Sequence, residues 1–110
     1  MRTIRFKKDC IEWIKTGRKT TTYRKNKKEG IYEIVRGSYY HCEHLGIVVR
    51  LTPIAPINKE ELISYYWQKE GDFETRWDFL AWLGEEKVTL PDFGWLMKVE
   101  YLGERKGEDR

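Results

Sequence analysis

The sequence is poor in side-chain amides and cysteine, and it has no long apolar run. Asn and Gln occur at only three positions (Asn26, Asn58, Gln68), whereas 35% of the residues are charged. This composition resembles that reported for thermophiles, which predicts a protein adapted to high temperature. No segment approaches the ~20 apolar residues of a membrane-spanning helix. The first ten residues, MRTIRFKKDC, lack the apolar stretch of a signal peptide, so we expect a cytoplasmic protein.

Cysteine and histidine occur only twice each. Cys10 and Cys42 are too few for a disulfide framework, and we expect reduced thiols. The segment YHCEH contributes His41, Cys42 and His44, and with Cys10 it offers four candidate zinc ligands. However, neighbouring strand residues point to opposite faces, and no C-x-x-C pair is present. We therefore expect no metal and no other cofactor.

The remaining composition is that of a folded domain with one basic region. With 40% hydrophobic and 15% aromatic residues, 110 residues suffice for one core. We expect one domain over residues 1–104 and a polar tail at 105–110. Residues 1–30 carry a net charge of +8 and the other 80 residues −5. An anionic partner would meet the basic third first, although a solvated basic face that keeps the protein soluble is the alternative.

The hydrophobic pattern predicts an α+β domain. A strand is expected over residues 3–6, followed by a helix over 8–15 that ends at Gly17. Further strands are expected at 20–24, 31–36, 38–44, 46–57 and 94–102. Pro53 and Pro56 are expected to end the fourth of these. This order favours a small, strongly curved sheet or barrel with helices on its rim.

Two helices are expected before the last strand. Asn58 and Glu61 form a capping-box pattern for the first, which ends near Glu70. Its inner face is expected to hold Leu62, Ile63, Tyr66 and Trp67. Asp72 is the expected N-cap of the second helix. Its inner stripe is expected to comprise Phe73, Trp77, Leu80 and Ala81.

The stretch GRKTTTYRKNKK, residues 17–28, combines six basic residues with three threonines and no acid. Strand alternation predicts that Thr20, Thr22 and Arg24 share one face, where they can bind a nucleobase, a ribose or a phosphate. Lys19 can join them only if a turn at Gly17 brings it round. The alternative for Lys19 is an ordinary surface lysine. The alternative for Arg24, independent of that turn, is a structural ion pair with a helix acid.

Residues 13–24, WIKTGRKTTTYR, resemble the signature of the ASCH family, an apolar residue followed by G-x-K-x-x-T-x-R. The family's second mark is an acid followed by glycine, an aromatic residue and an amphipathic helix. Residues 69–83, KEGDFETRWDFLAWL, resemble it, with Glu70 at the acid position. The element order between the motifs also matches. The resemblance implies a PUA-like small β-barrel with peripheral helices, whose cleft handles RNA or a nucleoside.

Some small members of this family are amidohydrolases that remove the acetyl group from N(4)-acetylcytidine. The resemblance implies that Lys19, Thr22 and Glu70 are catalytic. Residues expected to contact substrate or RNA are Arg24, Gly17, Thr20, Tyr23 and Trp67. An amide carbonyl needs a nucleophile, either the Thr22 hydroxyl or a water, a positive donor for the oxyanion and an acid for the leaving amine. The alternative for Glu70 is an exposed residue at a helix end.

Two other functions remain open at this stage. The basic N-terminal third is interleaved with Tyr23, Tyr32, Tyr39 and Tyr40, a pattern that can bind RNA without catalysis, although such tyrosines can equally be packing residues. A ribonuclease would need acid and base groups beside a 2′-hydroxyl, such as Lys19 with Tyr23 or a histidine. The expected partner is therefore RNA or a modified nucleoside and not a membrane, and we expect a monomer.

Overall fold

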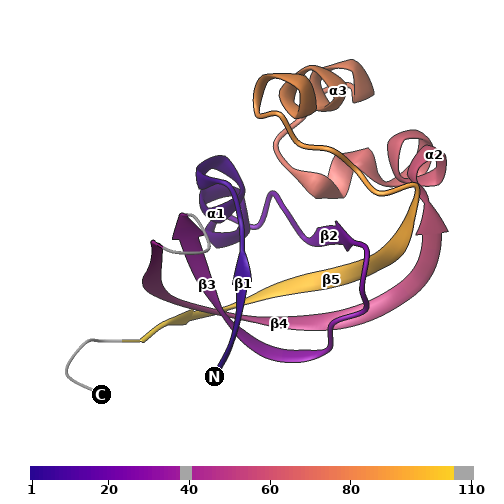
Figure 1. Cartoon of the computed structure of the whole chain (residues 1–110). Coiled ribbons are helices and arrows are strands. Elements are labelled where there is room, and N and C mark those ends of the chain that lie inside the picture. Colours follow the sequence, from indigo (N-terminus) through magenta and orange to yellow (C-terminus); the bar gives the residue numbers. More distant parts are fainter. Residues whose placement is uncertain (38–40, 106–110) are drawn as a thin grey trace.

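A computed structural model describes residues 1–37 and 41–105 (Figure 1). The strands are β1 (Arg2–Arg5), β2 (Thr21–Arg24), β3 (Gly30–Gly37), β4 (Cys42–Asn58) and β5 (Phe93–Glu104). The helices are α1 (Lys8–Lys15), α2 (Lys59–Glu61) and α3 (Arg76–Glu85). A π-helical turn η1 (Leu62–Tyr66) and a 3-10 turn η2 (Trp67–Glu70) continue α2. The predicted α+β class is therefore confirmed.

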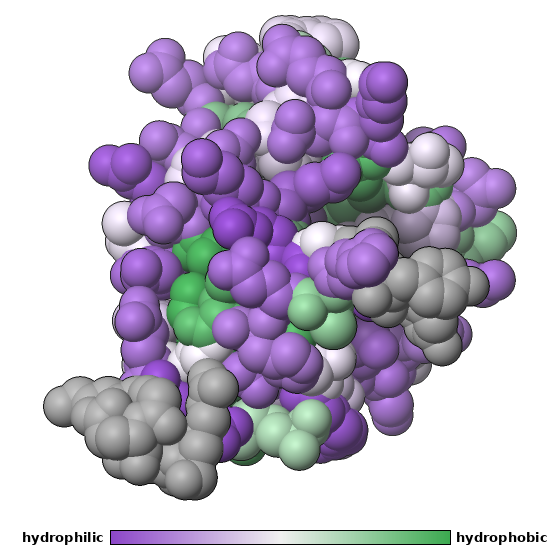
Figure 2. All heavy atoms as spheres, turned by 60° about the vertical axis from the view of Figure 1, so that its left-hand side comes forward, coloured by the Kyte–Doolittle hydropathy of each residue, from purple (hydrophilic) through white to green (hydrophobic). Residues whose placement is uncertain are grey.

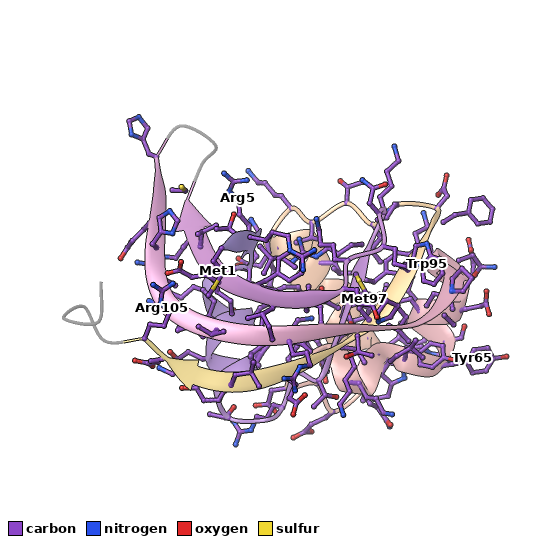
Figure 3. All side chains as sticks on the ribbon, turned by 90° about the horizontal axis from the view of Figure 1, so that it is seen from below. Met1, Arg5, Tyr65, Trp95, Met97 and Arg105 are labelled. Atoms are coloured by element: carbon purple, nitrogen blue, oxygen red, sulfur yellow. The ribbon has the colours of Figure 1, made fainter. Side chains whose placement is uncertain are left out.

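The five strands form one mixed sheet in the order β1-β3-β4-β5-β2. β1 runs parallel to β3, and the other neighbouring strands are antiparallel. β1 and β2 are the two edges, and no backbone pairing joins them in the part of the chain that the structure describes. The helices lie above the concave side of the curved sheet in Figure 1. Seen from below, Met1 and Arg105 lie toward one end of the long strands, and Trp95 and Tyr65 toward the other (Figure 3).

β4 is longer than the sequence pattern predicts. It continues without interruption through Pro53 and Pro56 to Asn58, so the expected break at the prolines is wrong. The β3 partner ends where Gly30 pairs with Leu51, and beyond that point β4 is hydrogen-bonded only to β5. A proline that lacks an N–H loses no bond on this open side. The strand expected at 38–44 is the start of β4, and its first residues, 38–40, lie outside the described part.

The first helix matches its prediction. α1 occupies Lys8–Lys15, and its buried residues Cys10, Ile11 and Ile14 have helical spacing. Gly17 has φ +80°, a left-handed conformation that glycine adopts without the steric cost of a Cβ. The amides of Gly17 and Arg18 donate to the carbonyls of the last helical turn. Gly17 therefore ends the helix as expected.

The predictions for the second and third helices are only partly correct. The capping box of Asn58 and Glu61 is present. For α3, however, the N-cap is Thr75, whose hydroxyl accepts from the Asp78 amide while the Asp78 carboxylate accepts from the Thr75 amide. Asp72 instead pairs with Arg18. The expected inner stripe is only partly correct. Leu80 packs against the core, and Phe73 does so from just before the helix, but Trp77 is 67% exposed and Ala81 is exposed. The buried residues of α3 are Phe79 and Leu83.

The two capping assignments predict different losses of stability. Thr75→Ala removes a hydrogen bond to the first turn of α3, and we expect the free energy of unfolding to fall by about 1 kcal/mol. Asp72→Ala removes only an exposed ion pair and should cost about 0.5 kcal/mol or less. Urea denaturation of the two variants measures both values. Equal losses would show that Asp72 stabilises α3 as much as Thr75 does.

The core consists of two apolar clusters. One lies between α1 and the sheet, and it includes Ile11, Ile34 and Val49. The other joins β2, η1 and α3, and it includes Leu62 and Phe79. Trp82 packs against both clusters. Rings also connect them, with centroids 5.2–5.9 Å apart, among Trp13, Phe73, Phe79 and Trp82.

The face of the molecule that Figure 2 shows is mostly hydrophilic. On the face shown in Figure 2, apolar residues appear only as separate areas among polar ones. Within residues 1–37 and 41–105, no helix has both the length and the apolar character to cross a lipid bilayer.

Candidate functional site

Lys19 is placed by the turn that follows α1. The amides of Arg18 and Lys19 both donate to the Trp13 carbonyl, at 2.8 and 3.0 Å. The turn that the sequence left open is therefore formed, and it directs the Lys19 side chain inward, where only 5% of the residue is exposed. Lysine is almost never this deeply buried without a partner.

Glu70 reaches the same place from the opposite half of the chain. It is the last residue of η2, and only 7% of it is exposed. The amide of Thr20 donates to the Lys69 carbonyl at 2.9 Å, which fixes η2 beside β2. A Cβ on the next residue, Gly71, would lie 2.7 Å from ring atoms of Trp13 and Phe73. Glycine at this position lets the chain pass close to the aromatic rings and keeps Glu70 in place.

Lys19 and Glu70 form a buried ion pair. The Lys19 Nζ lies 3.6 Å from Glu70 Oε1 and donates to the Glu70 backbone carbonyl at 3.1 Å. The Thr21 hydroxyl donates to Glu70 Oε2 at 2.5 Å, so both carboxylate oxygens have a partner. These contacts hold the carboxylate in one orientation. Sequence reasoning missed Thr21, because nothing local shows that η2 packs against that side of β2.

Thr22 and Arg24 form a second polar group beside this pair. Arg24 Nε donates to Thr22 Oγ1 at 3.1 Å, and a terminal nitrogen donates to the Arg5 carbonyl at 2.5 Å. The guanidinium also lies 4.7 Å from the Phe6 ring centroid. Burial lowers the pKa of Arg24. In the described part of the chain Arg24 has no ion pair with an acid, so the alternative role, a structural pair with a helix acid, is not found.

A cavity of about 740 Å³ opens beside both groups. Its volume lies within the range of about 300–1,000 Å³ typical of small-molecule sites. The predicted residues Lys19, Thr22, Glu70 and Arg24 all line it. Aromatic lining comes from Phe6, Tyr23, Phe79 and Trp82. The cavity therefore combines a hydroxyl, a carboxylate and cations with rings that can contact a flat base.

Three other predicted residues do not line this cavity. Gly17 and Thr20 border a separate hollow of about 400 Å³ beside Lys98, so Thr20 does not share the lining with Thr22. Trp67 packs against the cluster around Leu62. Their expected contact with a ligand in the main cavity therefore receives no geometric support.

Tyr23 lines the cavity, but its hydroxyl is already engaged. The residue is 6% exposed, and its hydroxyl donates to the Pro91 carbonyl at 2.8 Å. Burial raises the pKa of Tyr23, and the nearby Asp92 carboxylate adds to the effect. Tyr23 is thus a neutral phenol at physiological pH, and its hydroxyl is not free to bind a ligand.

Cys10 lines the cavity as well, and sequence reasoning treated it only as a buried thiol. Burial raises the pKa of Cys10, and this effect exceeds the lowering caused by Lys19. A thiol with a raised pKa is a weak nucleophile, because the thiolate is the reactive form. Phe6 and Trp82 are also among the lining residues that the sequence did not indicate. Their apolar periodicity predicts only burial.

The histidines lie elsewhere. His44 Nδ1 is 3.3 Å from the carboxylate of Glu33, and His41 is not a lining residue of the cavity. Cys42, in contrast to Cys10, is exposed. Among the residues that the structure describes, no group of three or more His, Cys, Asp or Glu side chains is arranged to hold a metal ion.

Comparison with known proteins gave no match: no family model fits the sequence, and searches of curated proteins and of solved structures found nothing similar.

Proposed function

We propose that this chain is an ASCH-type domain that hydrolyses the acetyl amide of N(4)-acetylcytidine to acetate and cytidine. The observation that carries the proposal is the buried Lys19–Glu70 pair in a cavity that Thr22 also lines. Burying two charges costs several kcal/mol per ion, and the geometry must offset that cost. Lysine and glutamate are almost never fully buried unless they are paired, and a nucleoside-sized cavity beside such a buried pair favours an enzyme.

The sheet is compatible with the PUA-like barrel that the resemblance implies. Its edge strands β1 and β2 are linked by the Arg24 side chain, which belongs to β2 and donates to the Arg5 carbonyl of β1. We propose that this side-chain bridge closes the curved sheet in place of a backbone ladder. Arg24 would then support the fold as well as the site.

In the proposed mechanism a water attacks the acetyl carbon. The Thr22 oxygen already accepts a hydrogen bond from Arg24, and no described carboxylate or imidazole is hydrogen-bonded to Thr22 as a base. Water is therefore the better nucleophile. Glu70 takes a proton from the water as the C–O bond forms, and Lys19 stabilises the oxyanion. Glu70 then gives the proton to N4 of cytosine as the C–N bond breaks.

Thr22 and the aromatic lining would position the substrate. Because its oxygen is occupied as an acceptor, the Thr22 hydroxyl still has a proton to donate to a carbonyl of the base. Phe6 and Trp82 offer ring surfaces within the same cavity. Orienting the amide against the Lys19–Glu70 pair lowers the entropic part of the barrier.

Incubation of the purified protein with N(4)-acetylcytidine tests the proposal. Chromatography measures the conversion. We expect the wild-type protein to form cytidine and the Lys19→Ala variant to form none. Circular dichroism of both proteins confirms that they are folded. Absence of turnover in the folded wild-type protein would refute the hydrolase function.

A second candidate is RNA binding without hydrolysis. It is favoured by the basic residues around the cavity, where seven Lys or Arg and one acid are lining residues. Stacking of bases on tyrosine is not supported, since Tyr23 and Tyr32 are buried and residues 39 and 40 lie outside the described part. The affinity for RNA bound through several phosphates would fall steeply as the salt concentration rises, whereas the affinity for a neutral nucleoside in the cavity would change little.

A further inference from the structure

The cavity is strongly cationic. Besides Lys19 and Arg24, five basic residues contribute to its lining: Arg5, Lys7, Lys8, Lys25 and Arg36. All five are exposed, which is expected for residues around a mouth rather than at the floor. Arg36 pairs with Glu43, but Lys7, Lys8 and Lys25 form no ion pair within the described residues. We call these five residues the basic rim.

Arg24 connects the basic rim to the cavity floor. All of its described hydrogen-bond acceptors are neutral, namely the Thr22 hydroxyl and the Arg5 carbonyl. Its positive charge is therefore largely buried without a matching carboxylate in contact. The one acid among the lining residues is Glu70, and it is already held by Lys19 and Thr21. A positive charge of this kind is best compensated by an anion from outside the chain.

We propose that the ligand of this cavity carries a phosphate ester on its ribose, which Arg24 and the basic rim bind. The inference rests on the proposed function in that a cytosine base is taken to occupy the aromatic part of the cavity. A guanidinium beside several ammonium groups suits the oxygens of a phosphate. A neutral nucleoside would bring no anion to Arg24, Lys7, Lys8 or Lys25, which have no ion pair within the described residues. The physiological substrate is thus a nucleotide or a nucleotide unit of RNA.

Titration calorimetry with unacetylated ligands tests this inference without requiring hydrolysis. We expect cytidine 5′-monophosphate to bind at least about tenfold more tightly than cytidine at low salt, and the advantage to shrink as salt is raised. A short cytidine-containing RNA with internal phosphodiesters separates the two sources of phosphate. Binding of the RNA as tightly as the mononucleotide identifies RNA, and weaker binding identifies the mononucleotide; both results support a phosphate site.

A charge-neutralising variant and a matched control complete the test. Lys8→Gln/Lys25→Gln should weaken binding of cytidine 5′-monophosphate by about tenfold and leave cytidine unaffected. Lys98→Gln removes an exposed charge that does not line this cavity, and it should change neither affinity. Equal affinity for nucleotide and nucleoside would overturn the inference. So would an equal loss in Lys98→Gln and the rim variant.

Failure of this inference and failure of the hydrolase proposal look different. Selective binding of the nucleotide without turnover of N(4)-acetylcytidine or its 5′-monophosphate would leave the phosphate site intact and refute the hydrolase. The opposite result is also distinguishable. If the acetylated nucleoside and its 5′-monophosphate are hydrolysed with the same kcat/KM, and cytidine and cytidine 5′-monophosphate bind equally well, the hydrolase is supported and the phosphate site is refuted.

Discussion

Lys19→Met is expected to lower the free energy of unfolding by about 3–5 kcal/mol, because it leaves the Glu70 carboxylate buried without its cation. Both partners of the pair are deeply buried, and their charged atoms lie 3.6 Å apart. Glu70 would keep the hydrogen bond from Thr21, but one hydrogen bond does not replace a neutralising charge. Urea denaturation, monitored by tryptophan fluorescence, measures the loss in the free energy of unfolding.

Two further variants distinguish a charge effect from lost packing. Lys19→Met/Glu70→Gln removes both charges while the Gln amide can still accept from Thr21, so its loss should be smaller than the sum of the single losses. Lys59→Met breaks an exposed pair with Asp92 of similar length, 3.4 Å, and should cost about 1 kcal/mol or less. Additive losses in the double variant would show that the two charges do not stabilise each other.

Glu70→Gln is expected to lower kcat for N(4)-acetylcytidine by about 10²–10⁴-fold, the usual contribution of a general acid–base group. Glutamine has almost the same shape, and it can keep the acceptor for Thr21, but it cannot take a proton from water. KM should change much less, since base and ribose contacts are retained. Steady-state kinetics of the purified variant measure both constants.

Glu33→Gln is the matched control for this rate effect. Glu33 is buried to the same extent as Glu70, at 7% exposure, but it lies outside the cavity and accepts from the Gly46 amide. The variant should lose some stability and keep kcat when assayed well below its melting temperature. A similar fall in kcat for both variants would mean that general loss of rigidity, rather than proton transfer by Glu70, causes the effect.

Local sequence signals predicted the elements whose boundaries depend on neighbouring residues. The bounds of α1 follow from apolar spacing and the glycine that ends it, and the Asn58–Glu61 box follows from a four-residue pattern. The prediction of the α3 N-cap was wrong because two nearby residues satisfy the same local pattern. Asp72 and Thr75 are both good N-caps by composition, and the choice depends on how the chain passes Trp13 after Gly71.

The candidate site was predictable in its residues but not in its geometry. The G-x-K-x-x-T-x-R pattern and the acid before Gly71 suggested Lys19, Thr22, Arg24 and Glu70, all of which line one cavity. The expected sharing of that lining by Thr20 failed. Strand alternation holds only within β2, which begins at Thr21, whereas Thr20 precedes the strand and donates its amide to the Lys69 carbonyl.

By itself, the sequence determined an α+β chain with a basic N-terminal third, the helix at Lys8–Lys15 and the concentration of hydroxyl and cationic groups just after it. Only the tertiary structure decided that β4 continues through its prolines, that Thr21 binds Glu70 and that Arg24 links two sheet edges. The physical reason is separation along the chain. Periodicity and capping act over a few residues, whereas Thr21 and Glu70 are 49 positions apart and meet only because η2 packs against β2.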